Sequence, residues 1–184
     1  MIKVDSWLRK ERGGSFLSFL IELPILILVA FVIAWVIKTV VMQPFFIPSS
    51  SMEPTLLPGD HVLVNKFVFR TRQPKRGEIV VFKYPADPSK DFIKRVVALE
   101  GETVQIRDGQ VFVDGTPMKE EFVSEEHDPT NFGPVKVTEG KLFVMGDNRT
   151  SSFDSRQFGL LPRKNILGKA FFVYWPLVRL GSLS

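Results

Sequence analysis

The longest apolar run in the chain lies near its N-terminus. Residues 16–41 are apolar at all but four positions, and residues 23–37 carry no charge. Because about 20 apolar residues are needed to cross a bilayer as an α-helix, a span here must also include Glu22, close to one membrane interface. The run is apolar on every face, which favours a membrane helix over a helix that packs one face against a protein core. The pattern therefore predicts one transmembrane helix over residues 16–41.

The charges on either side of this run predict its orientation. Basic side chains gather before it, within residues 1–15, whereas only Lys38 lies near its other end. By the positive-inside rule, residues 1–15 are cytoplasmic and residues 42–184 lie on the other side of the membrane. The alternative is a secretory signal that is cleaved off. Because residues 39–44 offer no small-x-small cleavage site, we expect a retained, single-pass anchor.

Beyond residue 41 the pattern changes to short segments that are rich in β-branched and aromatic residues and separated by Gly, Pro and Asp. Strand-like segments at such close spacing, with no helical pattern between them, predict an antiparallel β-sheet or partial barrel. We therefore expect a mainly β domain over residues 42–184. The predicted strands are residues 62–64, 79–82, 93–99, 104–106, 111–113, 142–145 and 170–174.

The clearest local signal is a hairpin at residues 103–113, where alternation continues on both sides of Asp108-Gly109. An Asp-Gly pair between two alternating segments predicts a type I′ turn. Residues 120–140 are polar, acidic and without periodicity, so we interpret them as a surface loop or a small elaboration.

Composition excludes several classes of site. The chain has no cysteine, so it has no disulfide, no cysteine nucleophile and no thiolate metal site. His61 and His127 are far apart and lack metal-ligand spacing, so we expect neither a metal nor another cofactor. Residues 1–41 hold five basic and three acidic residues, which gives +2 of the total charge of +4. Because the remaining charges are mixed in sign, we expect no binding to nucleic acid.

Candidate chemistry begins with the three serines at residues 49–51, which follow Pro48. A serine cluster is usually part of a loop, yet these hydroxyls lie among apolar residues directly beside the predicted membrane helix. A serine nucleophile needs a neighbouring base. A Ser-His-Asp triad built on His61 or His127 is one possibility.

A second candidate base is Lys94, which interrupts the strand-like run at residues 92–97. Alternate side chains of a strand share a face, so Lys94 lies on the same side as Phe92 and Val96. The simplest interpretation is an exposed lysine on a half-buried strand. If Lys94 is instead buried without a carboxylate partner, desolvation lowers its pKa, and the neutral amine can act as a general base near neutral pH.

A third polar element, Gly-Asp-Asn-Arg-Thr-Ser-Ser-Phe-Asp-Ser-Arg, occupies residues 146–156. Its first four residues have the composition of a turn. Asp154 and Arg156 could form an ordinary surface ion pair, which would contribute little to stability.

Together these segments resemble the type I signal peptidases, which are membrane-anchored Ser/Lys endopeptidases of bacteria and organelles. The resemblance extends over nearly the whole chain from the predicted anchor onward, and the order and spacing of the motifs make it specific. The matching motifs are Ser51–Leu56 with Gly59-Asp60, Arg76–Phe82, Lys94–Val97 with Gly101, Gly146–Arg156 and Gly168–Pro176.

The resemblance implies a serine endopeptidase that removes signal peptides from exported precursor proteins, after small residues at positions −1 and −3. It implies that Ser51 is the nucleophile and that Lys94 is the general base. Ser49 would contribute its hydroxyl to an oxyanion hole, together with the backbone N–H of Ser51. Ser152 would hydrogen-bond to Lys94 and orient it.

The resemblance also implies how the precursor is held. An extended peptide would add to the sheet edge as a strand, with its alternate side chains entering shallow pockets. Asp154 and Arg156 would brace the site from behind. The enzyme would lie in the plasma membrane, with a thylakoid or mitochondrial inner membrane as the alternatives. The pockets would be lined by Phe45, Ile47, Leu56, Phe92 and Ile93.

Some features depart from the family pattern. Ser50 stands where many members have glycine, and Thr150 stands where acidic or amide residues are common. The stretch between Lys94 and Gly146 is shorter than in large proteobacterial members, which implies a reduced second β region at about residues 100–140.

Two other functions are compatible with parts of the sequence. A membrane-anchored β module could bind extended peptides without cleaving them. A self-cleaving Ser/Lys protease, as in the stress-response repressors, would carry a DNA-binding domain where this chain has its apolar segment. For the leading function we also expect Phe45-Phe46 and residues 171–175 to rest on the bilayer, since aromatic side chains favour its interface.

Overall fold

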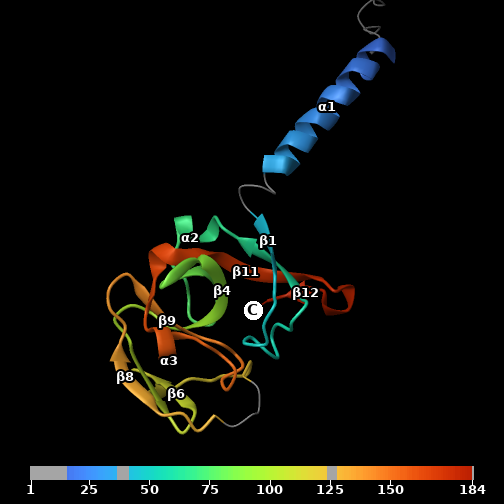
Figure 1. Ribbon diagram of the computed structural model, residues 1–184. Coiled ribbons are helices and arrows are strands. Elements are labelled where there is room, and N and C mark those ends of the chain that lie inside the picture. Colours follow the sequence, from blue (N-terminus) through green and yellow to red (C-terminus); the bar gives the residue numbers. More distant parts are fainter. Residues whose placement is uncertain (1–15, 37–41, 124–127, 184) are drawn as a thin grey trace, which may run out of the picture. The chain divides into compact units, whose positions relative to one another are not determined.

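The computed structural model describes residues 16–36, 42–123 and 128–183 (Figure 1). They belong to two compact units, which are α1 (Phe16–Val36) and everything from residue 42 onward. A helix therefore occupies the expected segment as far as Val36, and the predicted cytoplasmic residues lie outside the described part. Large apolar side chains of α1 are exposed from Ile21 to Trp35. Where side chains are described, no helix is both long and apolar enough to cross a membrane.

The second unit is mainly β, as predicted, and its described strands form two antiparallel sheets. The larger sheet has the strand order β1-β2-β11-β3-β4-β9-β10, with β12 paired to β11, and the smaller sheet has the order β7-β6-β5-β8. The strands are β1 (Met42–Phe46), β2 (His61–Asn65), β3 (Ile79–Tyr84), β4 (Asp87–Ala98), β5 (Thr103–Arg107), β6 (Gln110–Val113), β7 (Thr116–Pro117), β8 (Phe132–Lys136), β9 (Lys141–Met145), β10 (Leu161–Pro162), β11 (Ile166–Trp175) and β12 (Gly181–Ser182). Short helical segments are α2 (Val68–Thr71), α3 (Ser155–Phe158), η2 (Arg163–Asn165) and η3 (Leu177–Arg179).

Strand β11 joins the two halves of the larger sheet. The β1–β2 pair lies on one side of it and the β3–β4 pair on the other. Lys169 of β11 is in register with Asn65 of β2 and with Val80 of β3. A glycine is needed at the preceding position, because a Cβ on Gly168 would lie 2.4 Å from the carbonyl oxygen of Asn65. The position of β1–β2 relative to β3–β4 thus depends on β11.

The connection between β1 and β2, which carries the serine cluster, is held by the apolar core. Ile47, Met52 and Leu56 are buried there and pack in one cluster with Val81 of β3 and Ile93 of β4. Burying an aliphatic side chain of this size stabilises the fold by about 1.5–3 kcal/mol. The serines are therefore fixed against the sheet by their apolar neighbours.

The hairpin predicted at residues 103–113 is present as β5 and β6. Asp108 and Gly109 have φ angles of 45° and 79°, and positive values at both positions confirm the type I′ turn. A Cβ on Gly109 would lie 2.0 Å from the carbonyl oxygen of Asp128. The chain near Asp128 therefore packs directly on this turn.

The strand assignments at β4, β1 and β8 differ from the expectations in ways that the sequence explains. β4 begins at Asp87 rather than near residue 93, because its pairing with β3 continues beyond the apolar part of the sequence. β1 was not predicted, since it is short and contains Pro44, a residue that sheets accept at their edges. Of the two interpretations of residues 120–140, a surface loop is wrong for β8, which pairs with β5 although its outward side chains are polar or small.

Candidate active site

The structure brings Ser51 and Lys94 into direct contact. Ser51 begins the turn at residues 51–55, and Lys94 lies in β4. Lys94 Nζ donates a hydrogen bond to Ser51 Oγ at 2.6 Å. Lys94 is only 4% exposed and Ser51 only 7% exposed. The exposed-lysine interpretation of Lys94 was therefore wrong.

The surroundings of Lys94 favour its neutral form. Burial lowers the pKa of its ammonium group to about 8, against the weaker opposing effect of the Asp154 and Asp147 carboxylates. Within the described part of the chain, no carboxylate lies at ion-pair distance from Nζ. The ring of Phe92 lies on the same face of β4, with its centroid 5.8 Å from Nζ. Desolvation thus dominates, as a lysine base requires.

Ser49 and Ser152 both lie close to the nucleophile, but in different ways. Ser49 Oγ is 3.4 Å from Ser51 Oγ. Ser152 is 8% exposed, and its Oγ has no hydrogen-bond partner among the described residues. The hydrogen bond predicted between Ser152 and Lys94 is therefore not formed in this structure.

Gly146 explains how Ser152 is placed near Ser51. A Cβ at this position would lie 2.2 Å from Ser152 Oγ and 2.3 Å from the carbonyl oxygen of Ser51. That same carbonyl oxygen accepts a hydrogen bond from the Asn148 N–H at 3.2 Å. The backbone at residues 146–148 therefore lies directly against the nucleophile, and only glycine fits at the closest point.

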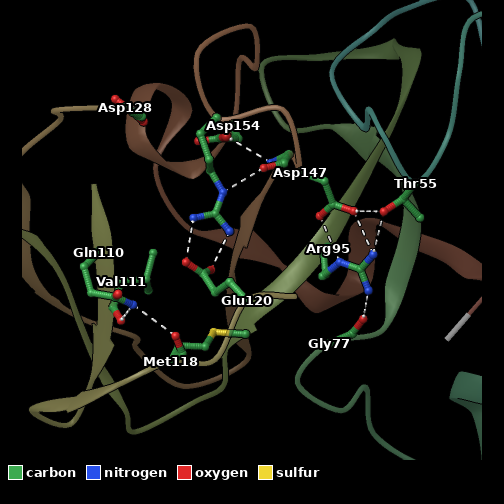
Figure 2. A network of polar contacts seen from close by, with 12 residues as sticks. Thr55, Gly77, Arg95, Gln110, Val111, Met118, Glu120, Asp128, Asp147 and Asp154 are labelled. Carbon is green, nitrogen blue, oxygen red and sulfur yellow. Dashed lines mark hydrogen bonds and ion pairs between the residues drawn. The ribbon is translucent and has the colours of Figure 1, made fainter. Parts of the chain in front are cut away.

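A buried ion pair that was not predicted from the sequence lies beside the site. Arg95 binds Asp147 with two hydrogen bonds, Nε to Oδ1 at 2.9 Å and Nη2 to Oδ2 at 2.7 Å (Figure 2). Arg95 also donates to the carbonyl oxygen of Gly77 at 2.8 Å, and Thr55 Oγ1 donates to Asp147 Oδ2 at 2.6 Å. The ring of Phe122 covers the guanidinium, with Arg95 Cζ 3.9 Å from the ring centroid. This network ties β4 to the turn that follows Ser51.

The side chains of Asp154 and Arg156 are only 0% and 5% exposed, so the interpretation of them as an ordinary surface pair was wrong. Asp154 is fully buried and caps α3, and its side chain also accepts from the Gly146 N–H at 3.1 Å. Arg156 donates to both Asp154 oxygens, at 2.9 Å from Nε and 3.0 Å from Nη2. Both residues contact the loop behind Ser51 and Lys94 rather than the reacting groups themselves.

A cavity of about 360 Å³ opens beside Ser51 and Lys94. It is lined by Phe45, Ile47, Phe92 and Ile93, four of the five residues expected to form substrate pockets. The prediction for Leu56 was wrong, because that side chain is fully buried in the core beneath the serine turn. Additional lining residues, unforeseen from the sequence, include Val81, Asp91, Ser151 and Phe153.

The sheet leaves a strand edge along this cavity. The Asp87–Lys94 part of β4 pairs with β3, whereas its pairing with β9 begins only at Arg95. On the other side of the cavity, β1 pairs only with β2 among the described strands. Backbone groups of β4 beside Lys94 are therefore available to an incoming peptide.

A histidine base finds no support in the described residues. His61 lies in β2, where its ring packs against Phe46 and its Nδ1 is 3.4 Å from Tyr174 Oη. It does not line the cavity that contains Ser51. His127 lies outside the described residues. Within the described ranges, no group of His, Asp and Glu side chains is arranged to hold a metal ion.

Known proteins share this arrangement of motifs. Residues 20–175 match the family model of signal peptidase, peptidase S26. The chain belongs to this family. A signal peptidase I from Leptolyngbya laminosa is 41% identical over 161 residues, which cover 83% of this chain and 78% of that protein. Signal peptidase I P from Bacillus subtilis subsp. natto is 37% identical over 164 residues, covering 84% and 88%.

A plant protein is also similar to this chain. Thylakoidal processing peptidase 1, chloroplastic, from Arabidopsis thaliana is 42% identical over 151 residues. The match covers 76% of this chain but only 44% of that longer protein. The family thus includes bacterial and chloroplast members of comparable similarity to this chain.

Proposed function

We propose that this signal peptidase cleaves signal peptides from precursor proteins with Ser51 as nucleophile and Lys94 as general base. The observation that carries the proposal is the 2.6 Å contact between Ser51 Oγ and the buried Nζ of Lys94. A lysine acts as a base only when its environment disfavours the charged form, and burial without a contacting carboxylate has that effect here.

The reaction has two proton-balanced stages. Neutral Lys94 accepts the Ser51 proton while Ser51 Oγ attacks the scissile carbonyl carbon, and the resulting ammonium then protonates the departing amine. The neutral lysine next removes a proton from water, which attacks the acyl-enzyme ester. As the ester bond breaks, the ammonium returns that proton to Ser51 Oγ and the acid product leaves. The cycle ends with both side chains in their starting forms, so the proposed mechanism requires no cofactor.

Charge that develops on the carbonyl oxygen needs hydrogen-bond donors. The Ser49 hydroxyl, 3.4 Å from Ser51 Oγ, is near enough to donate to an oxyanion formed on the bound peptide. We assign it to this role together with the Ser51 N–H. Removing one such donor costs about 10²–10³ in rate, so Ser49→Ala is expected to fall in this range.

Ser152 is assigned to orient Lys94. Its hydroxyl is buried without a partner and lies against Gly146, which also touches the Ser51 backbone. A buried hydroxyl without a partner is costly, and a hydrogen bond to the neutral amine would remove that cost. We expect this bond to form when a peptide fills the cavity and fixes the lysine.

The cavity suits an extended peptide with small side chains. The open edge at Asp91–Lys94 would supply main-chain hydrogen bonds, and the walls formed by Phe45, Ile47, Phe92 and Ile93 would leave room only for small residues at −1 and −3. Mainly apolar walls favour small uncharged side chains over charged ones. This accounts for the small-x-small specificity expected of the enzyme.

Helix α1 is proposed to anchor the enzyme in the plasma membrane, with the catalytic unit on the extracytoplasmic side. Exposed apolar side chains along Ile21–Trp35 support this, because water would not favour such a surface. The catalytic unit has its own exposed apolar residues. Phe46 and Trp175 are 57% and 52% exposed, and Val178 is 93% exposed. These are the side chains proposed to rest on the bilayer.

The test is cleavage of a small-x-small precursor by the full chain in lipid and detergent, for wild type and for Ser51→Ala and Lys94→Ala. Cleavage by wild type that both variants lose supports the dyad. Activity that survives in both variants would overturn it. If the wild type binds the precursor but never cleaves it, the chain is a peptide-binding module instead. Mass spectrometry of the intact protein identifies self-cleavage.

A further inference from the structure

Two acidic residues from the polar segment after β7 reach the back of the active site. The carboxylates of Glu120 and Asp128 are nearly buried, with side chains 10% and 11% exposed. Glu120 pairs with Arg149 and Asp128 pairs with Arg156. We refer to Glu120 and Asp128 as the acidic pair. Surface carboxylates of a loop would not be buried in this way, so their placement requires a reason.

Arg149 connects Glu120 to the carbonyl group of Gly146. Both terminal nitrogens of its guanidinium donate to the Glu120 carboxylate, with Nη1 to Oε2 at 3.1 Å. The remaining nitrogen, Nε, donates to the carbonyl oxygen of Gly146 at 3.0 Å. The Arg149 side chain is 3% exposed, so water cannot easily replace a lost partner. Glu120 therefore fixes the direction in which Nε points.

Arg156 connects Asp128 to the N–H group of the same glycine. Its Nη1 donates to Asp128 at 2.7 Å, while Nε and Nη2 donate to Asp154. Asp154 in turn accepts from the Gly146 N–H at 3.1 Å. A further bond from Arg156 Nη2 to the carbonyl oxygen of Arg149, at 2.7 Å, joins the two connections. Figure 2 shows contacts of the Glu120 and Asp154 carboxylates as dashed lines, with Asp128 to one side of them.

Both connections end at Gly146, the residue in closest contact with the nucleophile. One connection holds its carbonyl and the other holds its N–H. An added Cβ would meet Ser51 O and Ser152 Oγ at 2.3 Å and 2.2 Å, so the glycine backbone already touches both. Any displacement of Gly146 therefore moves the backbone of Ser51 or the hydroxyl of Ser152.

We propose that the acidic pair positions Gly146, and through it Ser51 and Ser152, for catalysis. The inference rests on the proposed catalytic roles of Ser51 and Lys94. Glu120 and Asp128 touch neither the cavity nor the reacting groups, so they are positioning residues. Glu120 and Asp128 are thus part of the support of the active site, although they lie between β7 and β8, two strands of the smaller sheet.

Isosteric substitutions test the proposal in the full chain. Glu120→Gln and Asp128→Asn each remove one charge with little change of shape. A displacement of the reacting groups by about 1 Å costs about 10²-fold, so we expect each variant to lower kcat by about 10- to 100-fold. KM for the precursor should stay within about twofold, since the peptide-binding walls are unchanged.

Glu121→Gln is the matched control, because Glu121 is adjacent to Glu120 but its side chain is 74% exposed and pairs with the exposed Lys119. It should keep both kinetic constants. If Glu120→Gln and Asp128→Asn also keep kcat, the proposal is wrong. Hydrogen exchange gives a readout that does not depend on activity. Faster exchange at the Gly146 and Asn148 amides in both variants supports the proposal, and unchanged exchange overturns it.

A double variant separates positioning from general stability. Glu120→Gln leaves the Arg149 guanidinium buried without its charge partner and should lower Tm. Adding Arg149→Gln removes the buried charge, so Tm should recover, while the hydrogen bond to Gly146 stays lost and kcat stays low. If kcat recovers together with Tm, the acidic pair has only a structural role. Wild-type protein that cleaves no precursor would refute the proposed function, and the exchange data would still decide the positioning of Gly146.

Discussion

Lys94 and Arg95 are neighbours on β4, both are cationic residues, and both are almost fully buried, at 4% and 2% exposure. Their surroundings are nevertheless opposite. Arg95 holds the Asp147 carboxylate with two hydrogen bonds. Lys94 touches a serine hydroxyl and an aromatic face, and burial brings its pKa down to about 8.

The difference shows what converts a buried cation into a base. Adjacent positions of a strand face opposite sides, so one step along the chain changes the environment completely. The side of Arg95 supplies a carboxylate that offsets the cost of burying charge. The side of Lys94 supplies none at contact distance within the described chain, so the amine can lose its proton. Lysine suits the second role because an arginine would keep its charge there.

The strongest test exchanges the base for its neighbour's residue type. Lys94→Arg keeps the positive charge and much of the volume, but a guanidinium cannot accept the Ser51 proton at any usable pH. We expect kcat to fall on the order of 10⁴-fold, which is the upper range for loss of a general base. Steady-state cleavage of a precursor measures this. Activity within tenfold of wild type would show that Lys94 is not the base.

Removing Arg95, the cation paired with a carboxylate, should change the free energy of unfolding more than removing Lys94 does. Arg95→Met leaves Asp147 buried without its partner and should destabilise the fold by about 3–5 kcal/mol. Thermal unfolding followed by circular dichroism measures the change. Adding Asp147→Leu should restore most of the loss, since the unpaired charge is then gone. A stable Arg95→Met variant would contradict the assignment of a buried ion pair.

Replacing Lys94, by contrast, should stabilise the fold. The ammonium of Lys94 is protonated below its folded pKa of about 8, against 10.5 for an unperturbed lysine. Folding at pH 7 must therefore bury a charge at a cost on the order of 3 kcal/mol. Lys94→Met should unfold at a higher temperature than wild type.

The same variant predicts a dependence of stability on pH. Between about pH 8 and 10.5 the unfolded chain binds more protons at Lys94 than the folded chain does, so wild-type stability rises with pH relative to the methionine variant. The difference in Tm between the two proteins should be constant below pH 8 and shrink above it. A difference that grows with pH would mean that the folded pKa is raised instead.

Activity should follow the titration of Lys94. Since the neutral amine is the base and burial lowers its pKa to about 8, kcat/KM should rise about tenfold per pH unit between pH 6 and 8 and level off above. The Ser152→Ala variant sharpens this test, since loss of an orienting hydroxyl should lower the plateau without moving the midpoint much. A pH-independent rate would exclude lysine ionisation from the rate-limiting step.

The smallest effect is expected at an exposed lysine on the neighbouring strand. Lys83 of β3 pairs with Asp91 at 3.2 Å, and the two side chains are 45% and 35% exposed. Water already solvates both charges, so Lys83→Ala should change the free energy of unfolding by less than about 1 kcal/mol. Urea denaturation provides the value. A loss of stability as large as that of Arg95→Met would mean that burial does not explain why the two ion pairs differ in their contribution.

The sequence was most informative where the chemistry of neighbouring residues disagrees. A lysine within an apolar strand and serines within an apolar turn both stand out locally. The resemblance to the type I signal peptidases then singled out Ser51 and Lys94 before the structure placed them together. The Asp108-Gly109 turn was also predicted from local sequence, since these two residues alone determine its conformation.

Features that depend on distant partners were not predictable. Arg95 and Asp147 are separated by 52 positions, and the local sequence around either residue does not predict that the two pair. Glu120 and Asp128 lie in a polar segment, and polarity was interpreted as exposure although arginines bury both carboxylates. Leu56 was assigned to a substrate pocket by resemblance, whereas packing with Met52 directs it into the core.

The place of β11 in the larger sheet has a consequence for when the enzyme becomes active. β1–β2 flank the segment with Ser51, β3–β4 carry Lys94, and only β11, at Ile166–Trp175, lies between these two pairs. Synthesis delivers β11 after every other strand except β12. Until it arrives, the nucleophile and its base belong to separate halves that have no shared ladder. Between the synthesis of Lys94 and that of β11, a nascent chain therefore carries both catalytic groups without being a protease.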